Sequence, residues 1–181
     1  MFKNGNIHMS VDGGDWGISG NSIHYLDVFN YLTEDIISIF NIDGLDKESY
    51  PSKRAGFFDF NGQIFVETLG GDKLVLNNNK NSDRPVTINI ANDYFRYIIF
   101  EDIGKAIVQN KFNSWEHTEI EFTIIPQSKL TSIILDEIFN LGRCDLISLE
   151  ESFPLHKPML EAFTGHLNKI NNTILEKCPI T

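Results

Sequence analysis

The sequence predicts an α+β fold in which an antiparallel sheet, a meander of short strands, packs with about four helices in a single domain, residues 1–181. The chain has 181 residues, 41% of them hydrophobic, which is enough to bury one sizeable core. Short segments that alternate apolar and polar residues, separated by Asp-Gly or Asn-Gly pairs, indicate hairpins. Longer segments with apolar residues every three or four positions indicate helices.

The N-terminal residues are expected to form a hairpin and then a helix. Strands are predicted over 6–11 and 16–19, because the Asp12-Gly13 pair between them suits a type I′ turn. A helix is predicted over about 26–41, where apolar residues recur at spacings of three and four and form one face. Asp43-Gly44 would end that helix.

The middle of the chain is expected to form the meander itself. Strands are predicted over 55–60 and 63–69, joined by a turn at Asn61-Gly62, and further strands over 73–76 and 86–90. The polar residues between these segments are typical of loops.

The last ninety residues are predicted to contain three helices and two strands. The helices are expected over 93–110, 128–141 and 158–177, and the strands over 117–125 and 145–149. Gly142 is a suitable end for the second of these helices, although its β-branched residues leave a strand open over 131–135.

A glycine-rich stretch, Val11–Gly20, raises the question of a phosphate or metal site. The spacing of its glycines matches neither the dinucleotide fingerprint nor the P-loop. Asp12 and Asp15 would repel a phosphate, and the oxygen-bearing residues fall at the wrong positions for an EF-hand loop. We therefore expect a turn here, with metal or phosphate binding as less favoured alternatives, and we predict neither a cofactor nor a metal ion.

The five histidines show no zinc-binding or metalloprotease spacing. His8 and His24 would come together only if the N-terminal strands pair. Otherwise both are expected to be ordinary surface or hydrogen-bonded side chains.

The formal net charge of −10 is concentrated at the two ends of the chain, with −6 in residues 1–50 and −5 in residues 101–181. Such a charge disfavours nucleic acid and anionic membranes as direct partners. No apolar run is long enough to cross a bilayer, and the N-terminus has no signal-peptide pattern. Cys144 and Cys178 are typical of reduced thiols, so a cytoplasmic location is expected.

Clusters of acidic residues, some beside a tryptophan, indicate a surface for a basic protein. Both tryptophans, Trp16 and Trp115, also suit a core position. The candidate partner-binding residues are Asp12, Asp15, Trp16, Asp43, Asp46, Glu48, Glu116, Glu119 and Glu121.

In length, acidic charge and lack of catalytic motifs, the chain resembles bacterial toxin-immunity proteins. The resemblance is one of profile and includes no diagnostic motif. It implies a non-catalytic protein that neutralises a basic toxin, such as a nuclease, by occluding the toxin's active site.

Two other classes of function remain open. The first is an enzyme that uses His117, Glu119, Glu121 or Asp15 for acid–base chemistry. Glu119 and Glu121 would lie about 7 Å apart on one face of a strand, a spacing that suits a carboxylate pair. The second is a structural or adaptor subunit, which would expose a hydrophobic patch rather than an acidic one.

Overall fold

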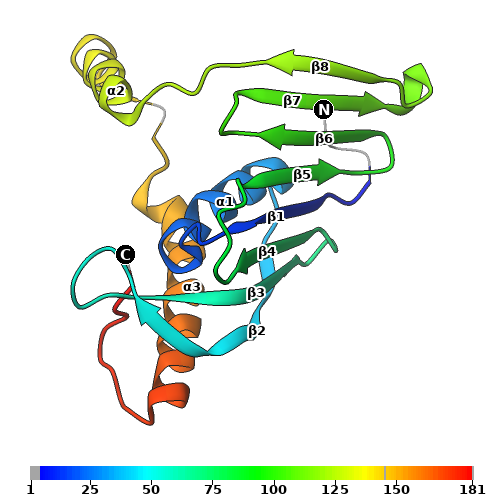
Figure 1. The fold of residues 1–181 in the computed structure, drawn as a ribbon. Coiled ribbons are helices and arrows are strands. Elements are labelled where there is room, and N and C mark those ends of the chain that lie inside the picture. The colour runs from blue at the N-terminus through cyan, green and yellow to red at the C-terminus, as the bar shows by residue number, and fades with distance from the viewer. Residues whose placement is uncertain (1–4, 145, 181) are drawn as a thin grey trace.

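A mixed β-sheet forms the centre of the fold in the computed structural model, which describes residues 5–144 and 146–180 (Figure 1). Within these residues there are eight strands, three α-helices and one short 3-10 helix. The elements are β1 (His8–Gly14), α1 (Ile18–Thr33), β2 (Ile37–Pro51), β3 (Phe58–Thr68), β4 (Lys73–Asn79), β5 (Thr87–Ala91), β6 (Phe95–Phe100), β7 (Lys105–Asn110), η1 (Lys111–Asn113), β8 (His117–Glu121), α2 (Gln127–Leu141) and α3 (Leu149–Asn171).

The strands lie in the order β2-β3-β4-β1-β5-β6-β7-β8. Strand β1 is central, parallel to β4 on one side and antiparallel to β5 on the other. The remaining neighbouring pairs are all antiparallel. Both neighbours of β1 in the sheet, β4 and β5, therefore lie more than sixty residues later in the chain.

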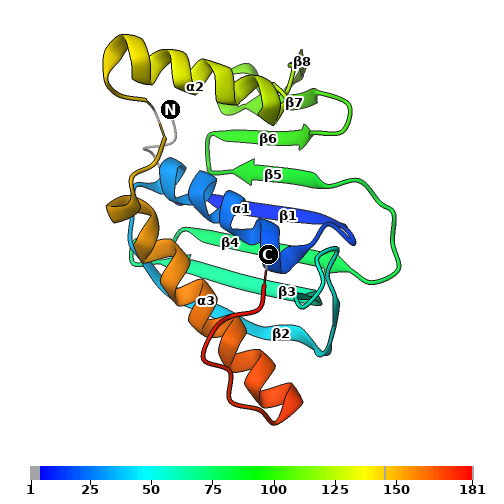
Figure 2. The same cartoon turned by 90° about the vertical axis from the view of Figure 1, so that its left-hand side faces the viewer.

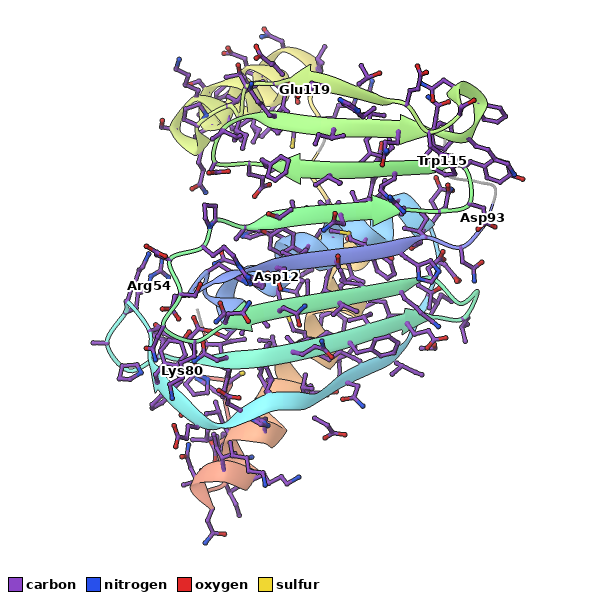
Figure 3. All side chains as sticks on the ribbon, turned by 45° about the vertical axis from the view of Figure 1, so that its right-hand side comes forward. Asp12, Arg54, Lys80, Asp93, Trp115 and Glu119 are labelled. Carbon is purple, nitrogen blue, oxygen red and sulfur yellow. The ribbon has the colours of Figure 1, made fainter. Side chains whose placement is uncertain are left out.

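The three α-helices lie on one side of the sheet (Figures 1 and 2). Helix α1 packs on β3 and β4, and α3 packs on β2 and α1. No helix of the described part of the chain covers the opposite face, which Figure 3 shows from that side. We call this second surface the open face.

The core lies between the sheet and helices α1 and α3. Because side chains alternate along a strand, every second residue of β1, β3 and β4 points toward the helices. The aromatic rings of Phe60 and Phe163 stack there with centroids 5.5 Å apart, and both side chains are fully buried. Other fully or almost fully buried side chains are Met9, Val11, Leu26, Phe29, Ile64, Val66, Leu74, Leu76, Leu155, Met159 and Leu167.

The predicted N-terminal hairpin is wrong. Asp12 and Gly13 lie inside β1, where they pair with Asn77 and Asn78 of the parallel strand β4. The segment predicted as a second strand, 16–19, instead leads into α1, which spans Ile18–Thr33 and not 26–41. Helix α1 ends early because Glu34 adopts a left-handed conformation.

The predicted turn at Asn61-Gly62 is also wrong, because β3 runs straight through it. Gly62 has a φ of 107° and lies against β2, where an added Cβ would overlap the Gly44 carbonyl oxygen. This glycine therefore permits a close approach between two strands rather than a reversal of the chain. Residues 45–51, which follow the expected helix end at Asp43-Gly44, belong to β2.

The helix predicted over 93–110 is a β-hairpin formed by β6 and β7. Its apolar residues do recur at helical spacing, but Tyr97 and Ile99 face the helix side of the sheet while Ile98 faces the open side. The turn between the strands contains Gly104 at a φ of 62°. Together with the parallel β1–β4 pair, this hairpin contradicts the predicted fold class: the sheet is mixed and eight-stranded, with three α-helices rather than about four.

The C-terminal helices follow their local signals more closely. The helix predicted over 128–141 is confirmed as α2, with Gly142 left-handed at its end. Helix α3 begins at Leu149 instead of 158, because Ser148 and Glu151 form a capping box. Of the strand predicted over 145–149, residue 145 lies outside the described residues, and no strand forms over 146–149.

In the described part of the chain, no helix is both long enough and apolar enough to cross a membrane.

Helix α2 is expected to be the least protected helix in hydrogen exchange. None of its residues is buried, whereas α3 buries Leu155, Met159, Phe163 and Leu167. Amides without packed side chains around them open locally, so exchange in α2 should be on the order of a hundredfold faster than in the middle of α3. Mass-spectrometric exchange on the intact chain measures this. Equal protection in both helices would show that α2 packs in solution.

Asp35 is expected to stabilise the fold in a pH-dependent way. Its carboxylate accepts the backbone N–H groups of Gly70 (2.6 Å) and Ile36 (2.7 Å), and these bonds lower the pKa of Asp35. A lowered pKa means that the contribution is present at neutral pH and is lost as the pH falls below the ordinary carboxyl range, about 4. Asp35→Asn should therefore lower the urea midpoint at pH 7 and have a smaller effect at pH 3.

The matched control for this prediction is Asp46→Asn. Asp46 is exposed in β2, so its change should leave the midpoint almost the same at both pH values. A deficit of Asp35→Asn that is equally large at pH 3 and pH 7 would contradict the proposed role of its charge.

Candidate functional site

The connection from β1 to α1 is the best candidate for a functional site. Asp15 (φ 44°) and Gly17 (φ 80°) both adopt left-handed conformations in this short turn. Gly17 offers no capping side chain, so the Asp59 carboxylate of β3 accepts the Ser19 N–H at 2.9 Å and caps the helix instead. The glycine-rich stretch therefore ends a central strand and begins a helix within three residues.

Trp16 is held firmly in this turn. Its backbone N–H donates to the Asn78 side-chain oxygen (2.9 Å), and its indole N–H donates to the Asn77 carbonyl oxygen (2.7 Å). Its ring meets the Tyr25 ring edge-on, with centroids 5.4 Å apart. The Asn21 amide donates to the Trp16 carbonyl oxygen (2.6 Å), which ties the turn to the first residues of α1.

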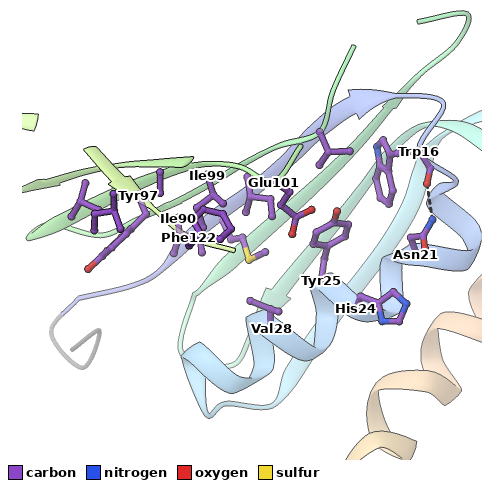
Figure 4. Close-up of a pocket in the computed structure, with 16 residues that line it drawn as sticks. Trp16, Asn21, His24, Tyr25, Val28, Ile90, Tyr97, Ile99, Glu101 and Phe122 are labelled. Carbon is purple, nitrogen blue, oxygen red and sulfur yellow. Dashed lines mark hydrogen bonds between the residues drawn. The ribbon is translucent and has the colours of Figure 1, made fainter. Parts of the chain in front are cut away.

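Two hollows meet at this turn, and Trp16, Asn21 and His24 line both of them. The apolar hollow, of about 670 Å³, lies between α1 and the helix side of β5–β8 (Figure 4). The polar hollow, of about 480 Å³, lies toward β2 and β3. Its other lining residues are Asp15, Gly17, Gly20, Tyr50, Pro51, Ser52, Lys53, Arg54 and Asp59.

A tyrosine and a glutamate face each other at the polar end of the apolar hollow. Figure 4 shows the Tyr25 hydroxyl turned toward the Glu101 carboxylate. Burial and this carboxylate raise the pKa of Tyr25 to about 12. The phenol is therefore protonated throughout the neutral range and acts as a hydrogen-bond donor.

His24 lies one helical turn before Asp27 on α1. Burial raises the pKa of Asp27, and the charges of His156 and His24 partly oppose that rise. One carboxylate oxygen of Asp27 is buried without a hydrogen-bond partner among the described residues. His24 therefore places an imidazole in both hollows, whereas the partly desolvated Asp27 carboxylate lines a separate hollow with Ile147 and Glu151.

The nine predicted partner-binding residues do not form one surface. Asp43, Asp46 and Glu48 lie in β2, at one edge of the sheet, whereas Glu119 and Glu121 lie in β8, at the opposite edge. Figure 3 shows Asp12, on central β1, well separated from Glu119. Asp15 and Trp16 are in the β1–α1 turn, and Glu116 immediately precedes β8.

Several of these acids already have basic neighbours. Asp12 pairs with Arg84, Glu48 with Lys80 (3.3 Å) and Glu121 with Lys105 (3.6 Å). These are exposed ion pairs of small energetic value. That the nine residues bind a basic protein stays a prediction.

The alternative set of acid–base residues lies in two separate places. His117, Glu119 and Glu121 share the open face of β8, because the intervening Ile120 lines the apolar hollow on the other side. Asp15 is on the turn before α1. His8 is on the open face of β1, because the adjacent Met9 lines the apolar hollow on the helix side, where His24 lies, so the two histidines do not meet. No group of His, Cys, Asp or Glu suited to a metal ion occurs among residues 5–144 and 146–180.

Sequence reasoning missed Tyr25 and Glu101 as site residues. Nothing in their spacing connects them, since one is on α1 and the other follows β6. The glycine-rich stretch was the one available signal, and it does mark the turn at which the site lies.

No family model matches the sequence, and no curated protein matches it significantly. Solved structures share the fold at low sequence identity. UDP-N-acetylglucosamine 3-dehydrogenase GnnA from Acidithiobacillus ferrooxidans matches with a TM-score of 0.63 and 11% identity, over 89% of this chain and 56% of that one. The dehydrogenase MviM from Clostridium difficile matches with a TM-score of 0.57 and 10% identity, over 95% of this chain and 57% of that one.

A Gfo/Idh/MocA family oxidoreductase from Vibrio cholerae matches with a TM-score of 0.50 and 13% identity, over 93% of this chain and 54% of that one. The chain spans little more than half the length of each of these three structures. The prediction of a non-catalytic toxin-immunity protein is wrong, because the proteins that share the fold are dehydrogenases and oxidoreductases. They agree better with the enzyme alternative.

Dehydrogenases commonly bind a dinucleotide where a glycine-rich turn leads into a helix. The β1–α1 turn does not fit that group. An added Cβ on Gly14 would overlap the Ser82 carbonyl oxygen, so the chain itself fills the space beside this glycine. The Asp59 carboxylate already occupies the N-terminal end of α1, and its charge would repel a pyrophosphate.

Proposed function

We propose that this chain is the substrate-binding part of an oxidoreductase that acts on a small alcohol or carbonyl compound. The observation that carries the proposal is the pair of hollows beside α1, which we together call the cleft. Trp16, Asn21 and His24 line both the apolar and the polar hollow. Sites with apolar walls and a few convergent polar groups are typical of enzymes. The fold shared with dehydrogenases supports the same proposal.

In this proposal, His24 exchanges a proton with the oxygen of the substrate. Imidazole is the side chain that ordinarily titrates near neutral pH, which suits general acid–base catalysis. Tyr25 is not suited to that role, because its pKa of about 12 keeps the phenol protonated. Its hydroxyl instead faces Glu101 at the end of the hollow.

The hydride acceptor would be held by a second domain or subunit, since the β1–α1 turn of this chain does not fit a dinucleotide.

The cytoplasmic location expected from the sequence stays a prediction.

Ligand-observed NMR with a panel of small alcohols, aldehydes and ketones tests the proposal. We expect several members of the panel to bind, and their binding to weaken in Trp16→Ala. The matched control is Trp115→Ala, which removes the other tryptophan far from the cleft and should leave binding unchanged. If no compound binds, or if the Trp16 substitution has no effect while the fold is retained, the proposal is wrong.

A further inference from the structure

We infer that the apolar hollow takes an amphipathic ligand, with an alicyclic or aromatic hydrocarbon body and a hydroxyl or carbonyl group at one end. This inference rests on the proposed function, because it names the substrate class of the same site. The inference excludes polyhydroxylated sugars as ligands of this hollow.

The walls of the hollow are a continuous apolar surface across four strands. Ile88 of β5 pairs with Ile99 of β6, Ile99 with Ala106 of β7, and Ala106 with Ile120 of β8. All four side chains face the helix side of the sheet and line the hollow. The other apolar lining residues are Met9, Val28, Val86, Ile90, Val108 and Phe122.

This part of the sheet has no helix packed on it in the described structure. Helix α1 packs on β3 and β4 and borders the apolar side chains of β5–β8 at one side, and α3 packs on β2. Figure 2 shows α2 in front of β7 and β8, but α2 buries none of its residues. Ile88, Ile90 and Ala106 are buried, whereas Ile120 is 46% exposed. A hydrocarbon body in the hollow would cover the apolar surface that remains in contact with water.

Most polar groups of the hollow gather at one end, whereas the Tyr97 hydroxyl lies at the opposite end (Figure 4). Figure 4 shows Trp16, Asn21, His24 and Tyr25 on the α1 side, with Glu101 opposite Tyr25, whereas Ile90 and Phe122 lie farther along the sheet. Two carbonyl oxygens, of Trp16 and Gly17, already accept the Asn21 amide. The hydrogen-bonding groups of Asn21, His24, Tyr25 and Glu101 lie close together at this end of the hollow.

A sugar would place most of its hydroxyl groups against the apolar walls. Hydroxyl groups that lose water without gaining a partner disfavour binding. A molecule with one terminal hydroxyl satisfies the polar end and leaves only hydrocarbon against the strands. The distribution of polarity in the hollow thus selects the hydrocarbon-bodied alcohol.

Borneol, a bicyclic alcohol, and myo-inositol, a ring with a hydroxyl on every carbon, test this selection. The full chain carrying Trp115→Phe retains Trp16 as its single tryptophan, and Trp16 lines the hollow. We expect its fluorescence to change in a saturable manner with borneol and to be unaffected by myo-inositol. Saturable binding of myo-inositol, or a lack of response to borneol, would overturn the inference.

A pair of variants on β7 locates the binding. Val108 lines the hollow, and the adjacent Ile107 lies on the open face of the same strand. Val108→Phe fills the hollow and should weaken borneol binding at least about tenfold, whereas Ile107→Phe should leave it unchanged. Equal effects of the two variants, with circular dichroism showing both folded, would contradict binding in this hollow.

Failure of the inference and failure of the proposed function have different signatures. Oxidation of polyols but not of borneol, with binding at Trp16, would overturn the ligand class and leave the oxidoreductase proposal intact. Tight binding of borneol without redox turnover in any preparation of the protein would overturn the oxidoreductase proposal and leave the ligand class intact.

Discussion

Phe163→Ala is expected to lower the free energy of unfolding by about 3–5 kcal/mol, the usual cost of removing a buried phenylalanine ring. Phe163 is fully buried, and its ring stacks on Phe60 with an interplanar angle of 9°. The truncation would leave a cavity between α3 and the sheet, because Phe60 is itself held on β3 and cannot fill the space. Urea denaturation followed by circular dichroism measures the loss.

Phe153→Ala is the matched control, because it makes the same change on the same helix. Phe153 is 55% exposed, and its ring contacts Lys157 rather than the core. Its loss should change stability by only about 0.5 kcal/mol. A similar small effect for Phe163→Ala would mean that α3 is not packed on the sheet in solution.

The sequence predicts those elements whose stability depends on local signals. Helix α2 is an example, because its apolar period and Gly142 are sufficient to define it. The alternating residues of β5 predict a strand in the same way, and 87–91 is a strand in the structure. Both features are properties of consecutive residues.

Two elements that depend on distant partners were predicted wrongly. Asp12-Gly13 has the composition of a hairpin turn, yet β1 is extended through it because β4, some sixty residues later, provides a parallel partner. The hairpin of β6 and β7 has apolar residues at helical spacing, and only its pairing with β5 favours the extended conformation. Propensity is overridden here by tertiary hydrogen bonds.

The candidate site shows the same limit. Its position follows from the glycine-rich turn, which the sequence makes visible. The pairing of Tyr25 with Glu101 does not, because Glu101 falls within a segment that was predicted as a helix. A site assembled from a helix and a turn between two strands requires the sheet order before its residues can be grouped.

His24→Ala is expected to reduce kcat/KM by about 10²–10⁴-fold, the usual contribution of a general acid–base group. The assay uses protein purified together with the domain or subunit that holds the hydride acceptor, and the alcohols or carbonyl compounds that bind in the NMR screen. His24 lines both hollows, and no other histidine lines either of them. Because it exchanges a proton rather than holding the body of the substrate, the loss should fall mainly on kcat, with KM changed little.

His8→Ala is the control for this variant, since His8 lies on the open face of β1 and lines neither hollow. Its kinetic constants should match those of the wild type. Added imidazole should restore part of the activity of His24→Ala, because the cleft is open to solvent and the missing group is a small base. A purely structural role for His24 predicts no such rescue, so a loss of activity that imidazole leaves unchanged, or full activity without His24, would exclude proton exchange by this residue.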